Sequence, residues 1–128
     1  MQSTIVNFVL VAIGGAIGST ARYAVAIFFS RYGFQFPMET FIVNILGCFL
    51  LGIVSQIAVK NELLSPEIRL FMAAGFCGGF TTFSTFMLEI ANLLEYHKII
   101  IAALYIGASS VGGLLSVLAG IWLVKLWV

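Results

Sequence analysis

Charged residues are scarce in this chain. They make up 9% of its 128 residues, whereas 62% of the residues are hydrophobic. A soluble domain carries about a quarter charged residues, and a domain of this size buries too little of its surface to hide so much apolar area from water. The composition therefore excludes an ordinary soluble domain and indicates a protein whose solvent is the lipid bilayer. The net charge of +1 gives no support to a nucleic-acid partner.

Cysteine and histidine are also scarce, which limits the chemistry available. Cys48 and Cys77 lie in apolar runs without CxxC spacing, so we interpret them as small packing residues. The single histidine, His97, lies beside Lys98 in a predicted loop, and no GxSxG motif occurs. An enzyme with a nucleophile and a general base is not predicted, because the sequence offers no such pair.

Long apolar runs dominate the sequence instead. A helix crosses a bilayer with about 20 mostly apolar residues, and four segments reach that length. Short loops separate the segments, so neighbouring helices are predicted to be antiparallel within one all-α integral membrane domain, residues 1–128. The four predicted spans are residues 5–29, 40–59, 68–94 and 99–127.

The third span contains a sequence that is unfavourable for a continuous helix. Gly78 and Gly79 are adjacent, and Thr81 and Thr82 follow them closely. Because glycine and threonine weaken a helix interior, we predict a helix broken at mid-membrane, with residues 78–81 unwound. Irregular backbone at that depth is tolerated where it is buried in protein or lines a cavity, and such breaks often form ion sites. The alternative is a glycine-rich packing kink.

Small residues recur at four-residue spacing in three of the spans. Such pairs let helix backbones approach closely in lipid. Packing is their default interpretation, and tight faces on several helices suggest that the bundle is completed by another copy. The pairs are Gly14 and Gly18, Gly75 and Gly79, Ser109 and Gly113, and Ser116 and Gly120.

Polar side chains within the spans are mostly neutral hydrogen-bond donors. The amide of Asn44 either binds an anion or joins two helices. Arg22 either extends to the headgroups or holds an anion near a vestibule, and Glu89 is expected to face protein or water. Phe83 and Phe86 share a helix face, where they either pack in the core or direct their electropositive ring edges at an anion. The hydroxyl donors of the third and fourth spans include Thr81, Thr82, Ser84, Thr85, Tyr105, Ser109 and Ser110.

The run GFCGGFTTFSTF, from Gly75 to Phe86, resembles the signature of the Fluc fluoride channels, also called CrcB proteins. A pathway of many weak neutral contacts suits conduction, which needs binding that allows both entry and exit. The resemblance extends over the whole chain. Its other matching positions are GGAIG with Arg22 and Tyr23, Thr40 with VNILG, and Glu89, Tyr105 and Ser109.

The resemblance implies a fluoride-selective channel in the plasma (inner) membrane of a microbe, which passively exports fluoride from the cytoplasm and relieves its toxicity. It implies a dual-topology antiparallel homodimer with two pores and a structural Na+ at its centre, held by the backbone carbonyls of Gly78 and Thr81. At Gly113 some relatives have Ser, so the polar track is expected to be shorter at that end. The implied fluoride pathway is Asn44, Phe83, Phe86, Thr40, Tyr105 and Ser109, with Arg22, Glu89, Thr82 and Ser84 as vestibule or accessory residues.

The distribution of positive charge bears on the dual topology. Lys and Arg near span ends normally set which side stays cytoplasmic. Here three positive residues lie on the side of the termini and two or three on the other, so the chain is predicted to insert both ways up. The first side has Lys60, Arg69 and Lys125, and the second has Arg31 and Lys98, with Arg22 close by.

A proton-coupled exporter of the small multidrug kind is the alternative function. It shares the four short helices and the antiparallel dimer. Such an exporter needs a titrating carboxylate at mid-membrane, typically in the first helix. The first span here has no acidic residue, and Glu89 is off-centre in the third.

Overall fold

The computed structural model describes residues 2–60 and 64–127, and it is helical in all the long segments of these ranges. Four helical stretches are long and apolar enough to cross a membrane, and each begins and ends within two residues of its predicted span. The third stretch consists of four consecutive pieces. The elements are α1 (Gln2–Ser30), α2 (Met38–Lys60), α3 (Pro66–Arg69), η1 (Leu70–Cys77), α4 (Gly78–Phe80), α5 (Phe83–Glu95) and α6 (Ile99–Trp127).

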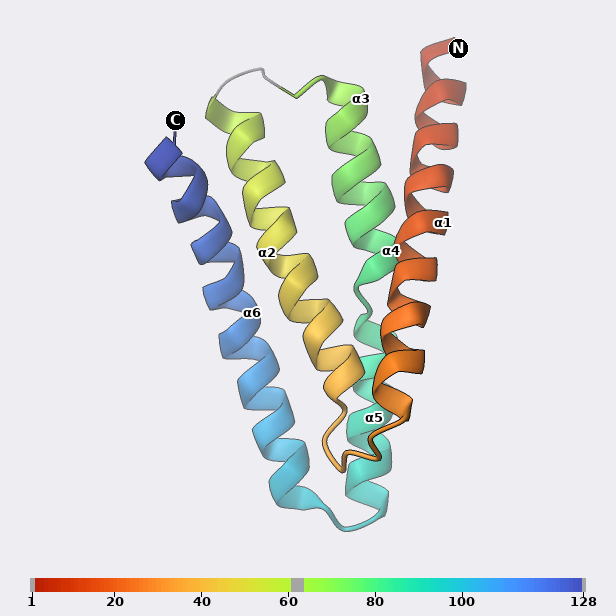
Figure 1. Cartoon of the computed structure of the whole chain (residues 1–128), viewed down its shortest axis with the longest axis vertical. Helices are drawn as coiled ribbons and strands as arrows, with labels where there is room; N and C mark the ends of the chain where they lie inside the picture. The colour runs from red at the N-terminus through yellow and green to blue at the C-terminus, as the bar shows by residue number, and fades with distance from the viewer. Residues whose placement is uncertain (1, 61–63, 128) are drawn as a thin grey trace.

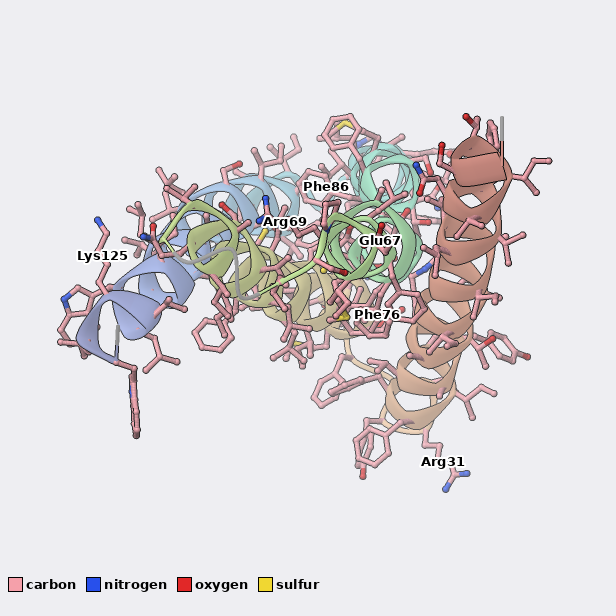
Figure 2. All side chains as sticks on the ribbon, turned by 90° about the horizontal axis from the view of Figure 1, so that it is seen from above. Arg31, Glu67, Arg69, Phe76, Phe86 and Lys125 are labelled. Atoms are coloured by element: carbon pink, nitrogen blue, oxygen red, sulfur yellow. The ribbon has the colours of Figure 1, made fainter. Side chains whose placement is uncertain are left out.

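The helices stand side by side rather than around a closed core. From one edge to the other the order is α6, α2, the third span and α1, and the start of α1 and the end of α6 lie at the same end as the end of α2 and the start of α3 (Figure 1). The buried core is small, and many large apolar side chains of α1 and α6 point outward (Figure 2). This arrangement fits a protein that is surrounded by lipid, where outward-facing apolar side chains cost nothing.

Local caps and turns explain where two of the helices begin and end. Ser65 caps α3 by accepting a hydrogen bond from the Ile68 amide at 3.3 Å, and Pro66 occupies the first helical position. Between α5 and α6, His97 adopts a positive φ of 58°, and the Lys98 amide donates to the Leu93 carbonyl at 2.8 Å. The predicted loop position of His97 is therefore confirmed as a helix-ending turn.

Glycines bring the backbones of α1 and the third span into direct contact. A Cβ atom added to Gly14 would lie 2.5 Å from the carbonyl oxygen of Phe71, and one added to Gly18 would collide with the carbonyl oxygen of Phe76. In the other direction, a Cβ on Gly79 would lie 2.5 Å from the carbonyl oxygen of Gly15. No larger residue fits at these positions without moving a helix.

Close packing at glycines also joins α2 to α6. A Cβ on Gly52 would collide with the carbonyl oxygen of Val117, and one on Gly120 with that of Phe49. Packing, the default interpretation of the small-residue pairs, thus holds at Gly14, Gly18, Gly75, Gly79 and Gly120. These faces are filled within one chain, so they carry no argument for a second copy.

The third span is interrupted in its middle, as predicted, but over a shorter stretch. Thr81 and Thr82 are extended, with φ and ψ of −83° and 159° for Thr81 and −151° and 124° for Thr82. Gly78 is helical, with φ and ψ of −63° and −37°, and α4 continues to Phe80. The prediction that the glycines are unwound is therefore wrong. Gly79 is needed for the close approach to α1, whereas Gly78 is exposed, and the break follows both glycines.

The helix before α4 is a π-helix, which was not predicted from the sequence. η1 extends from Leu70 to Cys77, and the Gly78 amide closes it by donating to the Ala73 carbonyl. π-helical turns are rare and are frequently found near functional sites. Here the wider helix lies against the glycine face of α1 and leads through α4 to the break.

Candidate ion-conduction site

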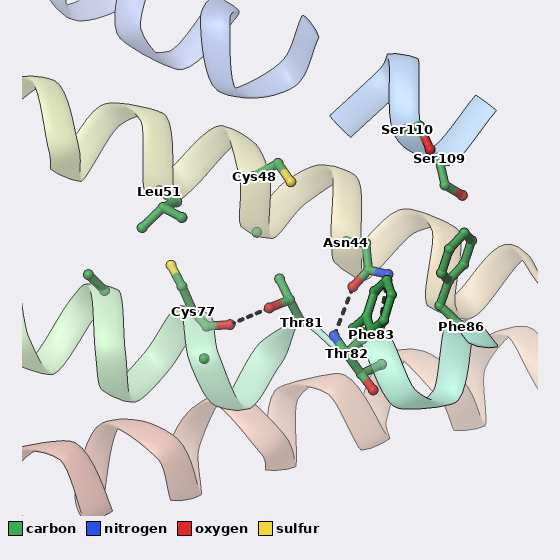
Figure 3. Close-up of a pocket in the computed structure, with 13 residues that line it drawn as sticks. Asn44, Cys48, Leu51, Cys77, Thr81, Thr82, Phe83, Phe86, Ser109 and Ser110 are labelled. Atoms are coloured by element: carbon green, nitrogen blue, oxygen red, sulfur yellow. Dashed lines mark hydrogen bonds between the residues drawn. The ribbon is translucent and has the colours of Figure 1, made fainter. Parts of the chain in front are cut away.

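The break is held in place by the amide of Asn44, which lies on α2. Its Oδ1 accepts a hydrogen bond from the Thr82 amide at 2.9 Å, and its Nδ2 donates to the Thr82 carbonyl at 3.1 Å (Figure 3). One side chain thus satisfies both backbone groups of an extended residue, as a neighbouring strand would. The helix-joining interpretation of Asn44 is therefore correct. An amide nitrogen has two hydrogens, so one remains for a further ligand.

Hydroxyl groups complete the two helix ends at the break. Thr81 Oγ1 donates to the Cys77 carbonyl at 2.8 Å, which closes the end of α4. Thr82 Oγ1 accepts from the Thr85 amide at 3.2 Å and so caps α5. Both threonines therefore terminate a helix, which explains why the chain is extended at these residues.

The same bonds deprive two carbonyl groups of their helical partners. In a continuous helix, Thr82 would donate to the Gly78 carbonyl and Thr85 to the Thr81 carbonyl, because each amide bonds four residues back. Here the Thr82 amide donates to Asn44, and the Thr85 amide to the Thr82 hydroxyl. The carbonyls of Gly78 and Thr81 are therefore available to a cation, and both residues line one pocket.

This first pocket, of about 400 Å3, lies between α2, the break and α6. Asn44, Phe83, Phe86 and Ser109 of the predicted fluoride pathway all line it (Figure 3). The pocket is open on one side, since Phe83 is 72% exposed. Its other lining residues are Gly47, Cys48, Leu51, Ala73, Cys77, Gly78, Thr81, Thr82 and Ser110.

Ser109 is an unusual member of this lining. Its hydroxyl oxygen is buried and has no hydrogen-bond partner among the described residues. Leaving a buried hydroxyl unpaired costs about 1–3 kcal/mol, and such groups in a native protein call for an explanation. A ligand that accepts a hydrogen bond inside the pocket would supply one.

The two phenyl rings have different surroundings. Their centroids lie 6.1 Å apart, and both rings line the pocket. Phe86 is buried and makes an edge contact with Tyr105, with centroids 4.8 Å apart. Phe83 projects from the face that the chain leaves open. The predicted common face is therefore confirmed, and Phe86 also packs in the core.

Thr40 and Tyr105 do not line the first pocket. Thr40 Oγ1 and Tyr105 OH each donate to a different carboxylate oxygen of Glu89, at 2.7 Å in both cases. Thr40 and Tyr105 are buried, at 4% and 0% exposure. The Glu89 carboxylate thus faces protein, as predicted, and the hydrogen of each hydroxyl is directed at it.

Arg22 reaches the break from the opposite side. Its Nε donates to the Gly79 carbonyl at 3.1 Å, so the side chain is held toward protein and does not extend along the lipid. It lines a second cavity of about 160 Å3, together with Thr40, Thr82 and Glu89. Ser84 is exposed and lies 3.5 Å from Thr82 through their hydroxyls. The accessory residues therefore gather around the break from two sides.

Several lining residues were not predicted from the sequence. Gly47 admits the Thr81 methyl group, which occupies the space of a side chain at that position. Gly47 and Cys48 follow Asn44 by three and four residues, so the helical spacing already places them on its face. This spacing could have placed both residues in the site from the sequence alone. The packing interpretation of both cysteines misses that they line the pocket.

The fold and the site define a multi-pass helical membrane protein with an interrupted span beside a pocket. A family model described as "CrcB-like protein, Camphor Resistance (CrcB)" matches residues 9–121. The "Fluoride-specific ion channel FluC" of Chlorobium phaeobacteroides (strain BS1) is 50% identical over 118 residues, which cover 92% of each chain. The protein of the same name from Prosthecochloris aestuarii is 44% identical over 127 residues, which cover 99% of each chain.

This chain belongs to the CrcB/FluC family of fluoride-specific ion channels. The family resemblance drawn from the run between Gly75 and Phe86 is thereby confirmed over nearly the full length. Membership in an ion channel family also confirms that the protein is not an enzyme. The alternative, a small multidrug exporter, receives no support from these relatives.

Proposed function

We propose that this chain forms a fluoride-selective channel, which lets fluoride leave the cytoplasm passively and so relieves its toxicity. The observation that carries the proposal is the pocket at the helix break, found in a chain whose relatives are named as fluoride channels. Its donors are neutral: the second N–H of Asn44 and the unpaired hydroxyl of Ser109. Neutral donors hold an anion weakly enough for it to leave again.

The phenyl rings complete the fluoride pathway in this proposal. A ring edge carries partial positive charge, so Phe83 and Phe86 offer an anion contacts without a full countercharge. Thr40, Tyr105 and Ser109 form the polar track on one side of the rings. For Thr40 and Tyr105 to serve fluoride, their hydroxyl hydrogens have to turn away from Glu89, which now accepts both. A low energy cost of that rotation is therefore part of the proposal.

We further infer that the working unit is a dual-topology antiparallel homodimer. One chain leaves its pocket open beside Phe83 and presents Gly78 on an exposed face. A second copy would cover both. A two-fold axis in the membrane plane makes the contact closed and self-complementary. The nearly even distribution of positive charge between the two sides supports insertion in both orientations.

The same geometry supports our inference of a structural Na+ at the dimer centre. The carbonyls of Gly78 and Thr81 have lost their helical donors to Asn44 and Thr82. Exposed carbonyls at a helix break are typical Na+ ligands in membrane proteins. Two carbonyls from each of two chains would provide four oxygens, and the bound charge would draw anions toward the middle of the membrane.

Fluoride efflux from liposomes tests the channel function. Liposomes that contain the purified protein are loaded with fluoride or with chloride, and efflux of each anion is followed. We expect rapid fluoride efflux and chloride efflux near that of protein-free liposomes. Equal efflux of the two anions would refute fluoride selectivity.

The topology is tested by biasing orientation. Two lysines are added to the α2–α3 loop in one variant and to the α1–α2 and α5–α6 loops in a second variant. Each variant alone is expected to be inactive, and co-expression is expected to restore fluoride resistance to cells that lack their own channel. Full resistance from either variant alone would show that a single orientation suffices.

A further inference from the structure

Three cavities of the chain form a series, because neighbouring cavities share residues. The first pocket and the second cavity share Thr82, at the helix break. The second cavity shares Glu39 and Glu89 with a third, of about 220 Å3, which lies between the α1–α2 connection and the α5–α6 turn. The second and third cavities thus lie one after the other between the break and one end of the molecule, and both are lined by the carboxylates of Glu39 and Glu89.

Glu39 is the member of this pair that has no assigned role. It belongs to the first turn of α2 and is half-buried. Glu89 is already engaged, since each of its carboxylate oxygens accepts a hydroxyl. Glu39 lines both outer cavities, so its charge acts on an ion in either of them.

The charged side chains around these two cavities balance. Arg22 lines the second cavity and Lys98 the third, while Glu39 and Glu89 line both. Two positive and two negative charges sum to zero. Without Glu39 the sum is +1. The cavities would then attract an arriving anion, whereas with Glu39 their net charge is zero.

We propose that the Glu39 carboxylate limits the rate at which anions enter the pathway from this end. The inference rests on the proposed function, because it assigns the outer cavities to the fluoride route. A helix N-terminus also favours an acidic residue for stability alone. That structural role predicts a less stable variant without Glu39, whereas the proposal predicts a faster one.

The size of the effect follows from Coulomb's law. A unit charge about 6 Å from an ion in water changes the local ion concentration by about threefold. Glu39→Gln is therefore expected to raise initial fluoride efflux from liposomes about threefold at about 0.01 M salt, where screening is weak. At about 1 M salt the difference from the wild type is expected to fall to about 1.2-fold, because the screening length is then about 3 Å.

Matched variants separate the effect of the Glu39 charge from the effect of its side-chain shape. Glu39→Ser, which keeps a side chain suited to the start of a helix, is expected to behave like Glu39→Gln and replaces it if that variant does not assemble. Lys98→Gln is expected to lower efflux about threefold, and the double variant with Glu39→Gln to return to the wild-type rate. Glu95→Gln is the control, since Glu95 is exposed at the end of α5 and lines neither cavity.

The possible results separate the two proposals. Unchanged or slower efflux in assembled Glu39→Gln or Glu39→Ser, with normal wild-type efflux, overturns the role of Glu39 and leaves the channel function intact. So does an equal acceleration by Glu95→Gln, or an acceleration that persists at high salt. Absence of fluoride efflux from the wild-type protein overturns the proposed function itself.

Discussion

Replacing Asn44 with alanine tests how the break is maintained. The change removes both hydrogen bonds to Thr82, at 2.9 and 3.1 Å, and leaves the side-chain volume largely empty. Side-chain hydrogen bonds between membrane helices contribute about 0.6 kcal/mol on average and about 1.7 at most, because the unfolded state also finds partners. Thr82 is extended and cannot turn its backbone groups to a helical neighbour, so we expect values near the upper end, about 3 kcal/mol in total.

The assay combines global and local stability. The free energy of unfolding is measured by titration with a denaturing detergent, and hydrogen exchange is measured at the Thr82 amide. A loss of about 3 kcal/mol corresponds to roughly a hundredfold faster exchange at this amide. Asn7→Ala is the matched control, since Asn7 is exposed on α1 and is expected to leave both measurements unchanged.

Asn44→Asp separates the two hydrogen bonds. Aspartate keeps an acceptor for the Thr82 amide but directs a carboxylate oxygen at the Thr82 carbonyl, so we expect a partial loss of stability and a complete loss of fluoride efflux. An unfolding free energy for Asn44→Ala within about 0.5 kcal/mol of the wild type, with normal exchange at Thr82, would refute the reasoning. The break would then be maintained by the capping threonines alone.

Three further predictions follow from the packing and the site. Phe83→Ile and Phe86→Ile are each expected to reduce fluoride efflux about tenfold while the proposed dimer persists, because isoleucine fills space without an electropositive edge. Wild-type efflux in both variants would leave the rings a packing role only. Gly18→Leu is expected to destabilise the protein by about 1–3 kcal/mol in detergent unfolding, as overpacking does, since even a Cβ atom collides with the Phe76 carbonyl. Gly107→Ala is the control and should not destabilise the protein, because nothing lies within 4 Å of its added Cβ. Removal of sodium and lithium from the buffer is expected to weaken the proposed dimer and lower efflux, with recovery on adding sodium. Full efflux and an unchanged oligomeric state without these ions would refute the proposed cation site.

Much of the fold is predictable from the sequence because the bilayer imposes a length on each helix. The apolar runs placed all four spans within two residues of their observed ends. The interruption of the third span was also predictable, since Gly78, Gly79, Thr81 and Thr82 are poor residues for a helix interior. These are local properties, and local sequence is sufficient to reveal them.

The position of the break was not predictable in this way. It depends on Asn44, which is distant in sequence from Thr82 but forms hydrogen bonds with both the amide and the carbonyl of Thr82. Gly79 packs directly against the backbone of α1, and that contact is visible only once the helices are assembled. The π-helix likewise has no signal in its residues, because its apolar composition suits an α-helix equally well.

The sequence predicted which residues belong to the site better than it predicted which atoms they contact. Asn44, Phe83, Phe86 and Ser109 do line one pocket, as a shared pathway requires. Thr40 and Tyr105 were expected to serve fluoride, but their hydroxyls point at Glu89. A sequence shows which donors exist, whereas the choice among acceptors depends on distances between helices.

The reversal potential of the current through a planar bilayer tests the central claim most directly. Fluoride is placed on one side and an equal concentration of chloride on the other, first at equal pH and then with a pH difference. The account predicts a current carried by fluoride alone, with a reversal potential strongly displaced toward that of fluoride and unaffected by the pH difference. A reversal potential near zero, or one that moves with the pH difference, would contradict a passive fluoride-selective channel.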